Sequence, residues 1–250
     1  MGRRNYSDGP QQIGDAKPMT ICIAAIAQDE YGPAIVTATD TRISWVDDST
    51  EGVITKIRRI NSHWFFAFAS EDISTIPLVV DDFRKELDGK FTLSDVWKGS
   101  GCVHARLGNP AQWQFLVAGF DESDTPHVLS IDGSGPLLED SIGYAAIGSG
   151  RYNAKFSLNS HPYRPRMSLP LAIYCVATAK FDAERAEGIG KQTFMSVLRP
   201  NQWYLDNSVP FMEEDIIDEI RVAWESLPTI PDGIEEHIGE FLQAKSHYAV

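Results

Sequence analysis

A threonine at the start of an apolar run is the first residue of this sequence that could do chemistry. Thr20 stands directly after Met19 in the stretch KPMTICIAAIAQ, residues 17–28. If the chain began at Thr20, this residue would carry a hydroxyl nucleophile and also a free amine that can take its proton. An α-amine has an unperturbed pKa of roughly 7.7 to 8.0, so it can act as a base near neutral pH. The stretch is therefore either an ordinary buried strand or a strand headed by a nucleophile.

Such a threonine needs charged neighbours, and the sequence offers two. A cation close to the hydroxyl would favour its deprotonated form, and a carboxylate would hold that cation in place. Asp40 ends the segment TATD, and Lys56 follows sixteen positions later in VITKI. Taken alone, a lysine is most often a solvated surface charge, and an aspartate often caps a turn. Their joint spacing with Thr20 is what indicates a catalytic group.

The elements that must position these residues include several short strands. Apolar and β-branched runs bounded by turn residues predict a strand, and two such runs joined closely by a segment with Gly32 and Pro33 predict an antiparallel hairpin. The predicted strands lie at 20–27, 34–42, 53–60, 63–70, 114–120, 127–132 and 144–149.

Helical patterns separate and follow these strands. Apolar residues recur at intervals of three to four at 73–87, from about 92 onward, at 168–186, around 216–224 and around 234–242. Thr92 or Ser94 can cap the second of these helices. The resulting order of strands, helices, strands and helices predicts an α+β fold in which mainly antiparallel sheets are covered by helices.

Five short segments of the chain occur in an order that is typical of a known family. They are Thr20 ahead of a strand, Asp40-Thr41-Arg42, Lys56, AGFDESDTPHVLSIDGSG at 118–135, and AAIGSGRYNA at 145–154. In this order they resemble the proteasome β-subunit family of N-terminal nucleophile hydrolases, from about residue 20 to about residue 190. Each segment is a weak signal alone, but five in the family's order form a strong one. The resemblance implies a four-layer αββα sandwich, with the threonine at the mouth of the cleft between the sheets.

The resemblance also implies a role for each matching residue. Thr20 would be the nucleophile and, through its amine, the general base. Asp40 and Lys56 would form the supporting ion pair. Ser149, in the Gly-Ser-Gly turn, would hydrogen-bond near the amine of the threonine.

Some positions depart from the family's pattern. The family has a late aspartate where this chain has FDAERAEGIG, so Glu184 or Asp182 would take its place. Ser70 stands where a family glycine donates its N–H to the oxyanion; a serine can also donate, but it lacks the tolerance of glycine for positive φ. Either the alignment slips by a residue or this hole is built differently. Ser44 and residues near Ser70 are expected to line the substrate-binding pocket.

The bond before Thr20 decides whether its amine is free. Met19 stands where self-processing members of the family have glycine. Residues 1–19 are therefore either a disordered leader or propeptide that is removed, or Met19 is the true initiator and its removal exposes the threonine. Residues 20–250 are expected to form a single proteasome-subunit-like domain, in which 205–250 is a C-terminal helical extension.

Composition argues against several other classes of protein. The formal net charge of −13 disfavours a nucleic-acid partner, because such binding requires clustered Lys and Arg. Three scattered cysteines without a CxxC pair argue against a disulfide framework, and Cys22 reads as a buried structural thiol. The six histidines show no ligand spacing, so we expect no metal and no cofactor. No secretory signal or membrane span is evident, so we expect a cytoplasmic protein without a membrane partner.

The expected reaction is hydrolysis of peptide or amide bonds through an ester on Thr20. The resemblance further implies peptide or protein substrates and a homo-oligomeric ring, and it leaves open an ATPase partner. Two alternatives remain. One is a non-catalytic structural subunit of such a ring, with the threonine permanently capped, and the other is a freestanding small-molecule amidase of the same fold. Exposure of Thr20 separates the first alternative from an enzyme, and native mass separates a ring from an amidase.

Overall fold

Two antiparallel sheets lie at the centre of the structure, a computed structural model that describes residues 20–40, 42–44, 49–51, 56–70, 75–107, 113–161, 163–200 and 211–226. The first sheet has the strand order β10 (Tyr144–Gly148), β1 (Ile21–Asp29), β2 (Gly32–Asp40) and β11 (Thr193–Leu198). The second has the order β5 (Ile57–Arg59), β6 (Trp64–Ser70), β7 (Trp113–Phe120), β8 (Pro126–Asp132) and β9 (Gly135–Leu138). A small hairpin pairs β3 (Arg42–Ser44) with β4 (Ser49–Glu51).

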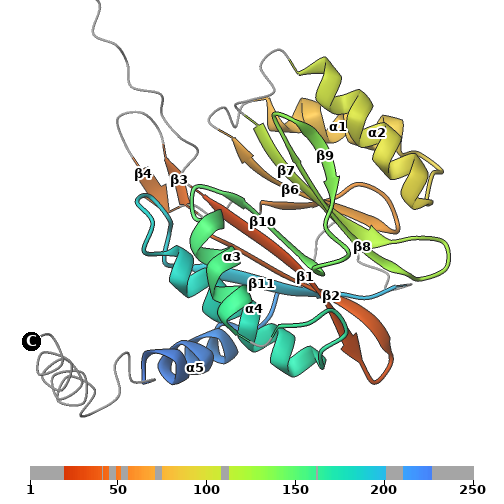
Figure 1. The fold of residues 1–250 in the computed structure, drawn as a ribbon. Coiled ribbons are helices and arrows are strands. Elements are labelled where there is room, and N and C mark those ends of the chain that lie inside the picture. Colours follow the sequence, from red (N-terminus) through yellow and green to blue (C-terminus); the bar gives the residue numbers. More distant parts are fainter. Residues whose placement is uncertain are drawn as a thin grey trace, which may run out of the picture.

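Helices cover the outer face of each sheet (Figure 1). The second sheet is covered by α1 (Ile76–Glu86) and α2 (Leu93–Arg106). The first sheet is covered by α3 (Arg151–Ser160) and α4 (Leu169–Ala183), and α5 (Glu214–Glu225) packs against α4. The order of layers is therefore helix, sheet, sheet, helix, and the predicted αββα sandwich is confirmed.

Three clusters of buried apolar side chains fill the three spaces between these four layers. Under α1 and α2 the cluster is aromatic, with Phe66 and Phe83 at a ring-centroid distance of 4.9 Å. The cluster between the two sheets contains many small side chains, among them Ala24, Ala67 and Ala118. Small side chains allow facing sheets to approach closely while the core stays densely packed.

Strand β1 explains the long apolar run that follows Thr20. Successive side chains of a strand point to opposite faces. Ile21 and Ile23 accordingly belong to the cluster beneath α3 and α4, whereas Cys22 and Ala24 belong to the cluster between the sheets. Because both faces of β1 are buried, the sequence shows a continuous apolar run instead of an alternating one.

Most predicted elements agree with the structure, and Thr92 rather than Ser94 caps α2, since its Oγ1 accepts a hydrogen bond of 3.2 Å from the Asp95 N–H. Among the described elements the prediction missed five: β3, β4, β9, β11 and α3. Helix α3 buries only a narrow face and leaves Tyr152 and Phe156 exposed, so its apolar pattern is weak. The expected leader 1–19 and the helix around 234–242 lie outside the described residues, and of the expected extension 205–250 the structure describes 211–226.

Candidate active site

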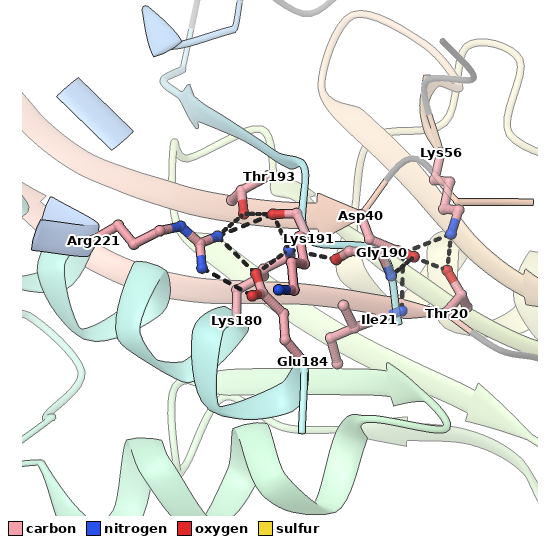
Figure 2. Close-up of polar contacts among 10 residues, drawn as sticks. All are labelled: Thr20, Ile21, Asp40, Lys56, Lys180, Glu184, Gly190, Lys191, Thr193 and Arg221. Carbon is pink, nitrogen blue, oxygen red and sulfur yellow. Dashed lines mark hydrogen bonds and ion pairs between the residues drawn. The ribbon is translucent and has the colours of Figure 1, made fainter. Parts of the chain in front are cut away.

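Three of the residues singled out in the sequence meet at one end of the two sheets (Figure 2). The Thr20 hydroxyl donates a hydrogen bond of 2.7 Å to Asp40 Oδ1 and accepts one from Lys56 Nζ. The ammonium group of Lys56 also lies 2.6 Å from Asp40 Oδ1. All three residues are buried. A buried nucleophile between a cation and a carboxylate is the arrangement that favours removal of a hydroxyl proton.

The two sheets supply different members of this group. Thr20 directly precedes β1 and Asp40 ends β2, and these strands form a hairpin in which Cys22 pairs with Thr39. Lys56 directly precedes β5, the edge strand of the other sheet. Only the packing of one sheet on the other therefore brings the ammonium group to the hydroxyl.

Both oxygens of the Asp40 carboxylate have partners, as a fully buried charge requires. Besides Thr20 and Lys56, Oδ1 accepts a hydrogen bond of 3.1 Å from the N–H of Ile21. Oδ2 accepts one of 3.2 Å from the N–H of Gly190, which lies between α4 and β11. The carboxylate thus joins the start of β1 to a segment 150 residues after Asp40.

The Gly-Ser-Gly turn after β10 holds the backbone of Thr20. Gly148 pairs with Ile21, and the N–H of Gly150 donates a hydrogen bond of 3.4 Å to the Thr20 carbonyl. Gly148 has a φ of +97°, and a Cβ there would lie 2.1 Å from that carbonyl oxygen. Only glycine fits this position. The hydroxyl of Ser149 is buried and has no hydrogen-bond partner among the residues that the structure describes.

The two residues expected in the substrate-binding pocket are placed differently. Ser70 ends β6 and pairs with Trp113. The φ angle of Ser70 is not positive, so a serine adopts this backbone conformation without strain. Its end of β6 is also the end near Lys56, because Ile57 pairs with Ala67 in the antiparallel register. Ser44 ends β3, where the structure describes the backbone alone.

Glu184, the candidate for the family's late carboxylate, has no described contact with Thr20. Its carboxylate lies 2.5 Å from Lys180 Nζ and accepts two hydrogen bonds of 2.8 Å from Arg221. The other candidate, Asp182, lies 3.5 Å from the guanidinium of Arg185. Neither carboxylate has a described contact with Thr20.

Lys180 is a buried residue of this region that the sequence interpretation missed. Its side chain is 0% exposed and donates hydrogen bonds to the carbonyls of Gly190 and Lys191, at 2.8 and 3.1 Å. Burial lowers the pKa of Lys180 to about 8, although the charge of Glu184 acts in the opposite direction. The signal in the sequence was a lysine within the otherwise apolar helix segment LAIYCVATAKF, where a solvated charge does not fit.

A cavity of about 310 Å³ lies between β5, β6 and α1, and Arg58 and Phe68 are among its lining residues. Arg58 is the central residue of β5 and lies two positions after Lys56. The carbonyl of Phe68 accepts a hydrogen bond of 3.4 Å from Cys22 Sγ, two residues after Thr20. The cavity therefore borders the parts of β5 and β6 that lie next to Lys56 and Cys22, and it presents a guanidinium that makes no ion pair with another described residue.

Other chemistry finds less support among the described residues. Burial raises the pKa of Cys22 to about 12, which keeps its thiol protonated and argues against a thiolate nucleophile. No group of three or more His, Cys, Asp and Glu side chains in the described part of the chain could hold a metal ion. No helix in that part combines the length and the apolar character that crossing a membrane demands.

Comparison with known proteins finds one family. Residues 101–194, from α2 to the start of β11, match the family model for the proteasome subunit. No curated protein matches the chain significantly. The matched segment includes β10, the Gly-Ser-Gly turn against Thr20, and the segment with Gly190 that contacts Asp40. Over these residues the chain is similar to proteasome subunits, and the αββα sandwich is consistent with that similarity.

Proposed function

We propose that this protein is a proteasome-like threonine hydrolase that cleaves peptide or amide bonds through Thr20. The observation that carries the proposal is the position of the threonine hydroxyl, which is hydrogen-bonded to both Asp40 and Lys56. The match to proteasome subunits adds support. The proposal requires that residues 1–19 be absent from the working form, by processing or by initiation at Met19, because the amine of Thr20 must be free.

In the proposed reaction, Thr20 Oγ attacks the carbonyl carbon of the substrate, and its proton passes to the threonine amine. Lys56 stabilises the developing negative charge on Oγ, and Asp40 holds that ammonium group. The carbon–nitrogen bond then breaks, and the amine gives its proton to the leaving nitrogen. A water molecule attacks the resulting ester, its proton passes to the amine, and that proton returns to Oγ as the acid is released.

Two further residues have proposed roles in this reaction. The unpartnered hydroxyl of Ser149 is suited to accept a hydrogen bond from the amine of a processed Thr20. The backbone N–H at Ser70 is proposed to lie near the substrate carbonyl, by the resemblance alone. We also propose that residues 20–250 form one domain and that copies of the chain assemble into a ring, as the match to proteasome subunits suggests.

N-terminal sequencing of the full chain from its native host, combined with labelling by a peptide epoxyketone, tests the proposal. This probe requires both the hydroxyl and the adjacent free amine, so it reports the proposed device itself. We expect Thr20 at the N-terminus, a label on this residue, and hydrolysis of peptide substrates. Thr20→Ser keeps the hydroxyl and should retain the label, whereas Thr20→Ala should lose it.

The alternatives give different results in the same experiment. A chain that retains residues 1–19 and takes no label would refute the catalytic proposal and favour a structural subunit. A labelled chain that is monomeric by native mass and that hydrolyses only small amides would favour the freestanding amidase.

A further inference from the structure

A continuous row of polar contacts joins the C-terminal helix α5 to the Asp40 carboxylate (Figure 2). It begins at Arg221 in α5 and passes through Glu184 and Lys180 at the end of α4. It then reaches the segment at Gly190 and ends at Asp40. Of these residues, only Asp40 takes part in the proposed mechanism.

The centre of the row is the Lys180 ammonium group. It has no exposed surface, and it is held by one carboxylate and by two carbonyls of the segment that carries Gly190. A buried ion pair of this kind is a weak source of stability, because the cost of desolvation offsets most of the attraction. Lys180 instead fixes the position of the backbone, because its ammonium group binds the carbonyls of both Gly190 and Lys191.

The segment fixed in this way contacts the active site directly. The peptide group at Gly190 offers its carbonyl to Lys180 and its N–H to Asp40 Oδ2. This N–H is the one described partner of Oδ2, whereas Oδ1 has three. A displacement of Gly190 would therefore release one side of the carboxylate that holds Lys56.

Helix α5 contributes Arg221, the outermost residue of the row. Arg221 donates two hydrogen bonds to the Glu184 carboxylate and a third, of 2.9 Å, to the Lys191 carbonyl. Its guanidinium also lies 4.0 Å from the ring centroid of Phe181. Bidentate pairing of this kind fixes the orientation of a carboxylate as well as its position. Arg221 thus fixes the Glu184 carboxylate, which contacts Lys180, and the Lys191 carbonyl, which belongs to the segment at Gly190.

We infer that Lys180 is a positioning residue for Asp40, and that Arg221 on α5 fixes Lys180 through Glu184, so that the C-terminal helix completes the active site. The inference rests on the proposed function, because the role of Asp40 is part of that proposal. Under this inference α5 is required for the reactivity of Thr20, although the helix contributes none of the residues Thr20, Asp40 and Lys56.

The test compares four variants of the full chain, in the form whose N-terminus is Thr20. They are Lys180→Met, Arg221→Met, Arg221→Lys and, as a matched control, Arg185→Met. Arg185 is also an arginine beside α5, paired with Asp182 and stacked over Trp224, but no described contact links it to Gly190. The measurements are hydrogen–deuterium exchange of the backbone at 186–192 and the rate of epoxyketone labelling, separated into its affinity and its maximal rate.

We expect Lys180→Met and Arg221→Met to speed exchange at 186–192 and to lower the maximal labelling rate about 10- to 100-fold, with affinity within about twofold. Arg221→Lys keeps one charged donor and should recover most of the rate, and Arg185→Met should match the wild type. Faster exchange without a change in the maximal rate would overturn the inference, as would unchanged exchange in both Met variants. If the wild-type protein takes no label, the proposed function fails, and exchange alone then decides whether Lys180 and Arg221 hold Gly190.

Discussion

Replacement of Lys180 by methionine should change how the stability of the protein depends on pH. Methionine has a similar length and no charge, so it removes the titrating group while filling most of the same space. In the wild type, burial lowers the pKa of Lys180 from 10.5 to about 8. Between these two values the unfolded chain binds a proton that the folded chain has released. Folding stability contributed by this group therefore rises with pH across that window.

The expected size of this effect follows from the two pKa values. A lowering from 10.5 to about 8 corresponds to about 3 kcal/mol between the limits of low and high pH. The full cost of burying the charged Lys180 is present below about pH 8, and about 1 kcal/mol of this cost disappears between pH 7 and pH 9. Because Lys180 has no exposed surface, solvent screening does not reduce this value much.

Equilibrium unfolding in urea at pH 7 and at pH 9 measures this effect. Other groups titrate in the same range, including buried thiols and phenols, so the quantity to compare is the wild-type free energy of unfolding minus that of Lys180→Met. We expect this difference to shift toward the wild type by about 1 kcal/mol at the higher pH. A difference that is the same at both values would show that Lys180 does not titrate in this window, and would refute the reasoning about its burial.

Three more predictions follow from other features. Gly148→Ala should destabilise the protein by about 2 kcal/mol or more in urea unfolding, because φ is +97° and Cβ would collide with the Thr20 carbonyl; Gly101→Ala, in helix α2 with open space around it, should instead be neutral or stabilising. We propose that the cavity lined by Arg58 receives the substrate side chain before the cleaved bond. Arg58→Met should then lower the preference for a glutamate over a leucine at that position about tenfold in kcat/KM, whereas Arg59→Met, on the opposite face of β5, should not. Equal effects of the two variants would disprove this role of the cavity. Burial alone would lower the pKa of His127, but its hydrogen bonds with Asp140 and Asp121 raise it. The protonated histidine therefore stabilises the folded protein fully below about pH 6.5, and this contribution is lost as pH rises through the higher pKa of the folded state. His127→Asn should abolish this part of the pH dependence of thermal unfolding.

Antiparallel sheets covered by helices could be predicted from the sequence because the strongest patterns belong to the central elements, whereas the four-layer order was implied by the resemblance. Strand β1 is buried on both faces and α1 has a regular apolar spacing, and both signals are local. Strand β11 and helix α3 could not be predicted so well. Helix α3 exposes Tyr152 and Phe156, and β11 is the edge strand next to β2, so long-range packing decides both.

The candidate site divides in the same way. Asp40 and Lys56 could be proposed because each stands at the end or start of a strand at a spacing that the resemblance made informative. The carboxylate assigned to the late position could not be placed, because the sequence does not show that Lys180 and Arg221 occupy both sides of Glu184. Those contacts depend on how α5 packs on α4, which local patterns do not reveal.

The division of the site between the two sheets has a consequence for the core. Thr20 and Asp40 lie on strands of one sheet or directly before them, and Lys56 directly precedes a strand of the other, so the contact between ammonium group and hydroxyl depends on how closely the sheets pack. The small side chains between the sheets, such as Ala24 and Ala118, therefore allow the close packing on which the contact between Thr20 and Lys56 depends. Added volume at these positions would move Thr20 and Lys56 apart without altering either residue, so under the proposed function the size of the core residues would limit the reactivity of the threonine.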